Sequence, residues 1–336
     1  MEERSRPTAA LPAGLAAAIA AQLERRPRKA LADSARRLSE SYRARKPTTE
    51  AIRDETDALA YALTRMPATY AAVVSALGKV AAEQPDFAPR SLLDVGSGLG
   101  AAAYAAAEIW PGLDAVEMLD RSPAFLTLAG ALSAESGVGP VAAGRITAGD
   151  MTRLGADAAP RDLVTAAYAL TELAESELDA VLDALWARTG GALAIVEPGT
   201  PRDYARLMRL RDRLLAQGAV ILAPCPHGEA CPLAPSDWCH FSVRLPRSRE
   251  HKALKGADAP FEDEKFSFLV AARWGLAPAG RVLAPARHGK AGVTLKLCES
   301  AGLREIFLPK RAKASYERFR KKDWGDAVSP LPERDG

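Results

Sequence analysis

The chain has 336 residues, of which 48% are hydrophobic and 26% charged, and its formal net charge at pH 7 is +3. This composition is typical of a folded soluble protein with one large or two ordinary domains, and the small net charge does not by itself indicate a nucleic-acid partner. No run reaches the roughly 18 apolar residues that a membrane-spanning helix needs, and four cysteines are too few for a disulfide scaffold.

The segment from residue 8 to 84 predicts a helical region. Four apolar residues recur at the spacing of one helix face: Leu11, Leu15, Ile19 and Leu23. We therefore interpret Ala9–Ala21 as a packed helix and not as a signal peptide. An arginine-rich helix over Arg28–Arg45 follows, and a further helix opens near Thr48 or Thr49.

Short apolar runs separated by helical stretches begin at Ser91. Five of these runs are predicted strands: Ser91–Val95, Ala115–Leu119, Arg145–Ala148, Leu163–Ala167 and Ala192–Val196. The alternation of strands and helices predicts a parallel sheet covered on both faces. A helix over Arg202–Gln217 follows the fifth strand.

The remainder of the chain is predicted to be a loop followed by a small β unit. The stretch Pro224–Pro246 is rich in Pro, Cys and His and predicts the loop. Four later runs are predicted strands of the β unit: Phe266–Ala272, Arg281–Ala284, Val293–Cys298 and Leu303–Leu308. A basic helix over Ala312–Lys322 follows them. We thus predict three parts, which are residues 1–85 (helical), 86–220 (Rossmann-like) and 221–336 (C-terminal extension).

A glycine-rich turn follows the first predicted strand, in Asp94-Val95-Gly96-Ser97-Gly98-Leu99-Gly100. Glycines fit there because the backbone must turn tightly and approach a ligand, whose polar groups meet the free N–H groups of the next helix. The pattern Asp-x-Gly-x-Gly-x-Gly resembles motif I of class I methyltransferases, in which the acid faces the methionine end of S-adenosylmethionine. Five cofactor-binding residues are predicted from this turn: Asp94, Gly96, Ser97, Gly98 and Gly100.

Residues after the next strands extend this site. Asp120 comes twenty residues after Gly100, where a carboxylate can accept hydrogen bonds from both ribose hydroxyls. Asp150 and Met151 resemble the acid and the apolar neighbour that contact adenine in such methyltransferases. Tyr168, after the fourth strand, completes the predicted cofactor residues.

A nicotinamide-dependent oxidoreductase is the competing interpretation, because similar turns bind dinucleotides. The dinucleotide fingerprint requires Gly-x-Gly-x-x-Gly, whereas Ala101 stands three residues after Gly98. The methyltransferase-like site therefore explains the turn better.

No catalytic residue is identified by the sequence. Methylation of a base nitrogen usually requires an Asn-or-Asp-Pro-Pro-aromatic run after the fourth strand, but Ala167–Glu172 reads Ala-Tyr-Ala-Leu-Thr-Glu. Methylation at carbon 5 of a pyrimidine requires a cysteine nucleophile, and the cysteines have a better explanation. Tyr168, Glu172 and the turn Glu197–Gly199 lie where a substrate would enter, but a structural role explains each of them at least as well.

The cysteines form a predicted metal site. Cys225, Cys231 and Cys239 fall within fifteen residues, and Cys298 comes from a later predicted strand. Four thiolates are the ligands of an iron–sulfur or a zinc centre. There is no Cys-x-x-Cys pair of the kind that structural zinc sites use, and prolines follow the first two cysteines. We therefore favour a four-iron, four-sulfur (4Fe-4S) cluster, with zinc as the alternative and free buried thiols as the third interpretation.

Basic residues gather in two groups. One group lies in the C-terminal tail: Arg304, Lys310, Arg311, Lys313, Arg318, Arg320, Lys321 and Lys322. The other follows the cysteine loop: Arg244, Arg247, Arg249, Lys252 and Lys255. Such clusters neutralise phosphate backbones, and Tyr316, Phe319 and Trp324 either stack on bases or pack into the core.

Together these features resemble one known family, the methyltransferase-like ribosomal small-subunit proteins of bacteria and mitochondria, which are involved in mitochondrial ribosome assembly. The matching stretches are Tyr61, Arg65–Tyr70, Asp94–Gly100, Glu197–Gly199, Pro224–His227 and Trp324–Asp326. We expect a bacterial member of this family. The resemblance implies a class I methyltransferase Rossmann-like sheet with an N-terminal helical region and a metal-bound C-terminal β extension.

The resemblance also implies bound S-adenosylmethionine, an iron–sulfur cluster on the four cysteines, and a role on small-subunit ribosomal RNA. Two functions from different classes remain open. One is an enzyme that methylates this RNA, and the other is a catalytically silent assembly factor that binds the small ribosomal subunit. We expect a cytoplasmic protein with no membrane partner that is a monomer when free.

Overall fold

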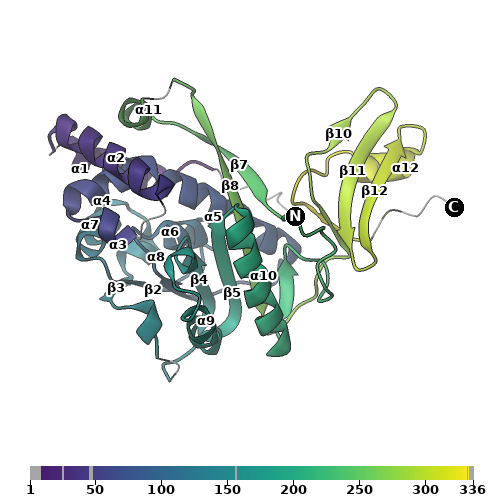
Figure 1. The fold of residues 1–336 in the computed structure, drawn as a ribbon, viewed down its shortest axis with the longest axis horizontal. Coiled ribbons are helices and arrows are strands. Elements are labelled where there is room, and N and C mark those ends of the chain that lie inside the picture. The colour runs from purple at the N-terminus through teal and green to yellow at the C-terminus, as the bar shows by residue number, and fades with distance from the viewer. Residues whose placement is uncertain are drawn as a thin grey trace.

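The computed structural model describes residues 9–24, 26–44, 48–155, 157–256, 258–330 and 332. Residues 1–8 of the predicted helical region and Arg45, the predicted end of its second helix, lie outside these ranges. The described chain forms a larger and a smaller β-sheet, and the smaller sheet lies at one end of the molecule (Figure 1).

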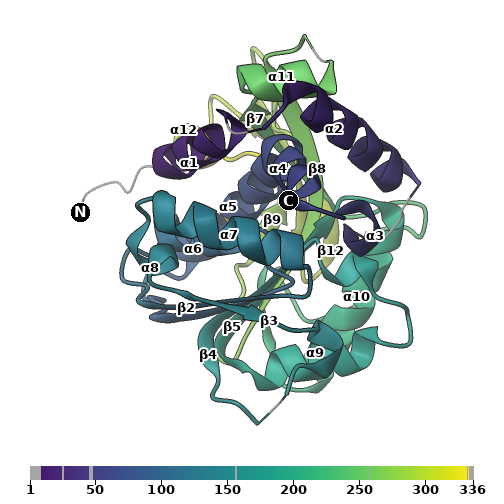
Figure 2. The same cartoon turned by 90° about the vertical axis from the view of Figure 1, so that its left-hand side faces the viewer.

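The N-terminal region is helical, as predicted. Its helices are α1 (Ala13–Glu24), α2 (Arg28–Arg43), α3 (Thr48–Ala51), α4 (Glu55–Thr64) and α5 (Met66–Glu83). The packed first helix is confirmed, because Leu15 and Ile19 are buried. Asp54 caps α4 by accepting hydrogen bonds from the N–H groups of Thr56 and Asp57. Helices α1 and α2 lie over the larger sheet, against α7 and α4 (Figure 2).

The larger sheet has eight strands in the order β3-β2-β1-β4-β5-β8-β6, and β7 also pairs with β8. The strands are β1 (Ser91–Val95), β2 (Ala115–Asp120), β3 (Arg145–Ala148), β4 (Arg161–Ala167), β5 (Thr189–Pro198), β6 (Val220–Ala223), β7 (Phe241–Pro246) and β8 (Phe261–Ala272). Strands β1 to β5 run parallel to their neighbours, whereas β8 runs antiparallel to β5 and β6. The parallel strands follow the order 3-2-1-4-5 of a doubly wound Rossmann-like sheet, so the predicted Rossmann-like fold is confirmed.

Strand β8 corrects one prediction. The run Phe266–Ala272 does not belong to the small β unit but lies between β5 and β6, where Val270 pairs with Ala194 and Ala223. The larger sheet therefore continues beyond residue 220. An apolar run shows that a strand is buried but not which distant strand it joins. Strand β7 likewise occupies the end of the stretch that was predicted to be a loop.

Helices cover both faces of the larger sheet, as predicted. They are α6 (Ala101–Ile109), α7 (Pro123–Glu135), α8 (Gly139–Ala142), α9 (Leu178–Ala187) and α10 (Pro201–Ala216), with single turns η1 (Met151–Arg153) and η2 (Leu170–Glu172). Leu93 and Val164 pack with α9 and α10 on one face. Leu92 and Leu163 pack with α5 and α6 on the other. This alternation is the period of two expected of a strand.

The smaller sheet has five strands, and three of them overlap the last three predicted strands. Its elements are β9 (Gly280–Val282), β10 (Arg287–His288), β11 (Gly292–Glu299), β12 (Gly302–Pro309), β13 (Ala327–Val328) and helix α12 (Lys313–Phe319). Helix α11 (Arg249–Lys255), between β7 and β8, was not predicted. None of the described helices has both the length and the apolar character that crossing a bilayer requires.

Candidate functional site

The glycine-rich turn joins the carboxyl end of β1 to α6. The N–H groups of Gly96 and Ser97 donate to the carbonyl of Leu119, at 2.8 and 3.0 Å. Gly96 has φ +67°, and a Cβ on it would lie 2.6 Å from the Cβ of Ala169 and 2.8 Å from the Cε of Met151. Both the backbone conformation and the close approach therefore require glycine at this position.

This turn forms one wall of a cavity with about 880 Å³ of empty space, its open mouth included. The cavity is lined by all but one of the predicted cofactor residues: Asp94, Gly96, Ser97, Gly98, Asp120, Asp150, Met151 and Tyr168. The exception is Gly100, which caps α6 in the left-handed conformation. The structure thus brings together residues from the ends of four neighbouring strands.

The N-terminal helices close this cavity, which the local sequence pattern does not predict. Tyr61 of α4 and Met66 and Thr69 of α5 line it together with Phe125 of α7. The rings of Tyr61 and Phe125 meet edge to face, with centroids 5.0 Å apart. Tyr61 and Arg65–Tyr70 belong to the stretches that carry the family resemblance, so the sequence marked these residues without indicating where they lie.

Asp94 is a buried acid at the end of β1. The Oγ1 of Thr165 donates to its Oδ1 at 2.8 Å, while its Oδ2 is buried and makes no hydrogen bond with any described residue. Burial raises the pKa of Asp94 to about 7. A buried acceptor without a partner, on a residue that lines a cavity, is suited to a hydrogen-bond donor of a ligand.

Asp120 lies at the end of β2 and is oriented by the backbone. Its Oδ2 accepts a hydrogen bond from the N–H of Gly98 and its Oδ1 from the N–H of Ser122, both at 2.8 Å. Burial raises the pKa of Asp120 above its usual range. Each carboxylate oxygen has a second lone pair, so Asp120 can still accept hydrogen bonds from two hydroxyl groups.

Asp150 and Met151 lie after β3. The Oδ1 of Asp150 accepts hydrogen bonds from the N–H and the Oγ1 of Thr152, both at 2.9 Å. The hydrogen bond from this N–H lowers the pKa of Asp150, so the group is ionised at neutral pH. Its Oδ2 lies 3.7 Å from the guanidinium of Arg121. The two side chains thus present a charged acceptor and an apolar surface on one wall of the cavity.

Tyr168 is strained, because its φ is +56°, in a region that residues other than glycine seldom adopt. Its hydroxyl donates to the Oε1 of Glu264 in β8 at 2.8 Å. Burial raises the pKa of Tyr168 well above its usual range, so the hydroxyl keeps its proton. Strained residues gather at functional sites, and this one lies where β4 ends beside the cavity.

Of the two interpretations of Glu197, a residue at the substrate entrance or a structural residue, its contacts fit the structural role. Its two carboxylate oxygens accept hydrogen bonds from the N–H groups of Leu170 and Thr171, at 2.9 and 3.2 Å. Burial raises the pKa of Glu197 to about 8. The acid therefore holds the loop that follows β4.

A second, more open cleft adjoins the cofactor cavity and has about 1380 Å³ of empty space. Tyr61, Thr69, Tyr168 and Glu172 line both spaces. A molecule in this cleft would therefore lie next to a molecule in the cavity, at the carboxyl ends of β4 and β5.

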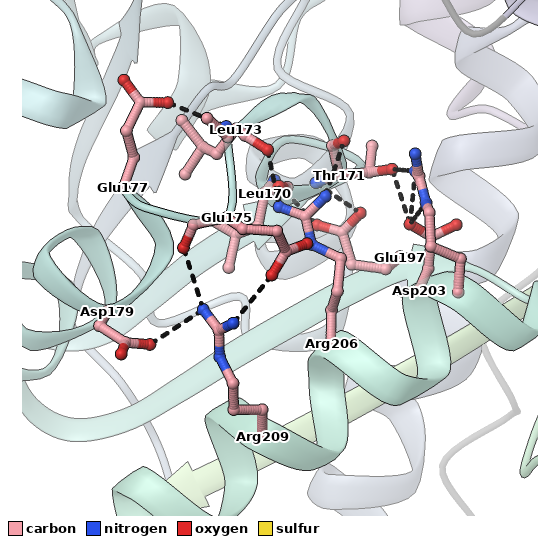
Figure 3. A network of polar contacts seen from close by, with 12 residues as sticks. Leu170, Thr171, Leu173, Glu175, Glu177, Asp179, Glu197, Asp203, Arg206 and Arg209 are labelled. Carbon is pink, nitrogen blue, oxygen red and sulfur yellow. Dashed lines mark hydrogen bonds and ion pairs between the residues drawn. The ribbon is translucent and has the colours of Figure 1, made fainter.

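Two arginines of α10 contact the loop after β4, part of which lines this cleft (Figure 3). Arg206 donates to the carbonyls of Leu170 and Leu173, at 3.1 and 2.8 Å. Arg209 pairs with Glu175 at 2.8 Å and with Asp179 at 3.1 Å. These guanidinium groups therefore tie the loop after β4 to α10.

The four cysteines line one cavity with about 530 Å³ of empty space. Cys225, Cys231 and Cys239 come from the loop between β6 and β7, and Cys298 comes from β11. Burial raises the pKa of the Cys298 thiol to about 12 and also raises those of Cys225 and Cys239. Within the described ranges, no group of three or more His, Cys, Asp or Glu side chains is arranged to hold a single metal ion.

Polar groups surround these thiols, and the tyrosine and the two arginines among them were not identified from the sequence. The hydroxyl of Tyr204 lies 3.1 Å from the sulfur of Cys231, and the Nε2 of His227 lies 3.5 Å from that of Cys298. Two arginines are buried nearby, and both hold the cysteine loop by its carbonyl groups. Arg211 binds the carbonyls of His227 and Glu229, at 2.8 and 2.7 Å, and Arg281 binds that of Pro224 at 2.8 Å.

Both predicted basic groups contain residues that form ion pairs with acidic side chains of the protein. Arg244 pairs with Asp263 at 2.7 Å, and both Arg247 and Lys255 pair with Glu262. In the tail, Arg304 pairs with Glu299 and Arg320 with Glu317.

The three aromatic residues that were predicted either to stack on bases or to pack, Tyr316, Phe319 and Trp324, pack against other side chains. Phe319 is buried in the core of the smaller sheet, and Tyr316 packs partly against that core. The ring of Trp324 meets those of His240 and Phe241, at 5.3 and 6.2 Å between centroids. Packing is therefore the correct one of the two interpretations for these residues.

Known proteins are similar to this chain over most of its length. It is 31% identical to the human mitochondrial ribosome assembly protein METTL17 over 303 residues, which is 81% of this chain and 62% of that protein. It is 25% identical to the mitochondrial Rsm22-cox11 tandem protein 2 of Schizosaccharomyces pombe, covering 82% of this chain and 44% of that protein. The chain thus spans less than two thirds of the length of these relatives.

Among solved structures, magnesium protoporphyrin IX methyltransferase of Synechocystis PCC 6803 with bound SAH is similar with a TM-score of 0.41 and 15% identity. That similarity covers 62% of this chain and 84% of the methyltransferase. The family described as mitochondrial small ribosomal subunit Rsm22 matches residues 55–329. Because this match contains the glycine turn, the cysteine loop and both sheets, the chain belongs to the Rsm22 family.

Proposed function

We propose that the protein binds S-adenosylmethionine and transfers its methyl group to small-subunit ribosomal RNA during ribosome assembly. The observation that carries the proposal is the placement of Asp94, Asp120 and Asp150 around one cavity that adjoins a second cleft. The names of the family and of the human relative support the small subunit and its assembly as the context.

In this proposal, each of the cavity residues binds a different part of the cofactor. Asp94 faces the methionine amine, Asp120 accepts from the ribose hydroxyls, and Asp150 with Met151 contacts the adenine. The bound cofactor supplies an electrophilic methyl group on its sulfonium. The cleft beside Tyr168 places a nucleophile of the RNA next to that group.

The proposal is tested by incubating the purified protein with small-subunit RNA and cofactor labelled in the methyl group. The proposal is supported if the wild-type protein and the Asp114→Ala variant transfer label to the RNA and the Asp94→Ala variant does not. Asp114 is a matched control, because it is an exposed acid paired with Arg90 at the start of β2, outside the residues that line the cavity. Cofactor binding without label in the RNA would contradict methyl transfer.

A second function, that of a catalytically silent assembly factor, is favoured by two observations. The residues after β4 lack the Pro-Pro-aromatic run, and the hydroxyl of Tyr168 is already bound to Glu264. In that case the cofactor only stabilises the fold, and its binding shifts the unfolding transition without any transfer.

The affinity for S-adenosylmethionine should increase as the pH rises from 6 to 8. The pKa of Asp94 lies at about 7, so the carboxyl is largely neutral at pH 6 and ionised at pH 8. Only the ionised form attracts the cofactor's ammonium group. Calorimetry at several pH values checks this, and Asp94→Asn should weaken binding and flatten the profile. An unchanged slope in Asp94→Asn would show that another group titrates.

We further propose that the four cysteines hold a 4Fe-4S cluster, with zinc as the alternative. The chemistry of the donors fits, since four thiols line one cavity and two buried arginines, Arg211 and Arg281, bind the carbonyl groups of the loop that carries three of these thiols. A cluster held there would join the loop after β6 to β11 of the smaller sheet.

Anaerobically purified protein is expected to absorb broadly near about 400 nm, as iron–sulfur proteins do. Cys298→Ser should lose this band and the bound iron, whereas Ser300→Ala, at an exposed neighbour, should keep both. Stoichiometric zinc in a colourless protein would identify the alternative metal. The monomeric state and the cytoplasmic location remain predictions.

A further inference from the structure

One face of the smaller sheet exposes large apolar side chains. Along β11, Val293, Leu295 and Leu297 are buried, so the residues between them lie on the opposite face. The strand register pairs Thr294 with Phe307 and Cys298 with Leu303 of β12, which places these residues on that opposite face.

Phe307 and Leu303 stay accessible on this face. They are 49% and 40% exposed, and they are two of the four large hydrophobic residues that are exposed in the described part of the chain. Leu303 lies beside Cys298, whereas Phe307 lies toward the other end of β12, beside Thr294. In the strand register, Arg287 of β10 lies opposite the same Thr294. A guanidinium from β10 and an aromatic ring from β12 therefore flank this threonine.

Cations surround Phe307 at this end of the sheet. The N–H of Lys310 donates to the carbonyl of Ala291 at 2.8 Å, which joins the turn after β12 to the turn between β10 and β11. The exposed side chains of these two turns and of the first residue of α12 include four cations: Lys290, Lys310, Arg311 and Lys313. No ion pair joins any of these four to a described residue, whereas Arg287 pairs with Glu305 at 2.6 Å.

We propose that this Phe307 surface, formed by Arg287, Lys290, Phe307, Lys310, Arg311 and Lys313, binds single-stranded RNA, with an unpaired base stacked on the Phe307 ring. The proposal rests on the proposed function, which supplies RNA as the partner. An exposed aromatic ring near cations, four of which form no ion pair with a described residue, is the combination that binds single strands, because the ring stacks a base while the cations neutralise phosphates.

The chemistry of the surface favours this occupant over two others. A duplex keeps its bases stacked inside the helix and offers mainly its backbone and groove edges, so it has no free base for Phe307. A second copy of the chain docked on the same surface would bring the unpaired lysines and Arg311 against each other, and like charges in contact oppose association. The smaller sheet also lies at one end of the molecule, where a strand can approach it (Figure 1).

Fluorescence anisotropy of the full chain with a labelled single-stranded oligonucleotide and with a duplex of the same length tests the proposal. Phe307→Ala should weaken single-strand binding roughly tenfold, the typical effect of losing one base stack. Phe307→Trp should restore it. Leu303→Ala is the matched control, because Leu303 lies on the same strand and face with similar exposure.

The cations are tested by salt dependence. Lys310→Glu combined with Arg311→Glu should weaken binding and make the slope of log affinity against log salt shallower by about 1.4, if each side chain neutralises one phosphate of a single strand. An unchanged slope would overturn the role of this turn.

The surface is ruled out if Phe307→Ala binds the single strand as well as Leu303→Ala does, or if wild-type protein prefers the duplex. Dimerisation that disappears in Phe307→Ala, measured by sedimentation, would instead assign the surface to self-association. Calorimetry with S-adenosylmethionine separates this proposal from the proposed function. Phe307 variants should keep the wild-type affinity for the cofactor. If the wild-type protein binds RNA through Phe307 but binds no cofactor, only the methyltransferase proposal is contradicted.

Discussion

Replacing Arg281 with methionine is expected to destabilise the protein by roughly 3–5 kcal/mol, the usual cost of removing one partner of a buried ion pair. Arg281 is fully buried and pairs with Glu83 of α5 through both terminal nitrogens. It also donates to the carbonyls of Pro224 and Gly325, at 2.8 and 3.1 Å. Methionine fills much of the same volume but leaves these acceptors without the donors of Arg281.

Urea denaturation followed by circular dichroism measures this loss, and Arg244→Met is its control. Arg244 also pairs with an acid, Asp263, but on the surface, where solvent screens the pair, so its variant should unfold near the wild-type midpoint. If the four cysteines hold the proposed cluster, the iron content gives a second readout, because the Pro224 carbonyl precedes Cys225 and a released loop should then bind less metal. Equal midpoints for the two variants would show that Arg281 does not stabilise the fold.

Arg281 joins three parts of the chain that the sequence presents as separate. Its contacts reach the end of α5, the start of the cysteine loop and the turn at Gly325, which immediately precedes β13. In the sequence, Arg281 is one arginine at the start of an apolar run. Nothing local distinguishes it from an exposed arginine, because its burial depends on residues about 57 and 198 positions away.

The parallel half of the larger sheet could be predicted because each strand is an apolar run that a helix follows. Predicted and observed strands agree within a few residues from Ser91 to Pro198. The antiparallel half was misassigned, since β8 comes after a long cysteine loop and α11 yet inserts beside β5. Local periodicity reports burial, whereas strand order depends on pairing between distant segments.

The same difference between local patterns and long-range contacts explains which site residues could be predicted from the sequence. The residues of the glycine turn form a local motif, and four of the five cofactor residues predicted from it, all except Gly100, line one cavity. The contributions of Tyr61 and Arg211 come from other elements and leave no local pattern. Two aromatic residues of the tail show most clearly that local sequence does not predict burial. Phe319 is buried and Phe307 is exposed, yet both lie among basic residues in the sequence.

Replacing Gly96 with alanine is expected to lower the affinity for S-adenosylmethionine tenfold or more. A Cβ there would lie 2.6 Å from the Cβ of Ala169 and 2.8 Å from the Cε of Met151, so the wall after β4 or the side chain of Met151 must move. A cost of about 1.4 kcal/mol in rebuilding the cavity already corresponds to a tenfold loss of affinity. Calorimetry with the cofactor measures the effect.

Gly137→Ala isolates this steric effect from backbone strain. Gly137 has the same φ of +67°, but a Cβ on it would meet no atom within 4 Å. Both variants should therefore lose about 1–2 kcal/mol of stability to the left-handed conformation, and only Gly96→Ala should lose cofactor affinity. If the two variants bind the cofactor equally well, the ligand does not occupy the space between Gly96, Met151 and Ala169, and the cavity at the end of β1 is not its binding site.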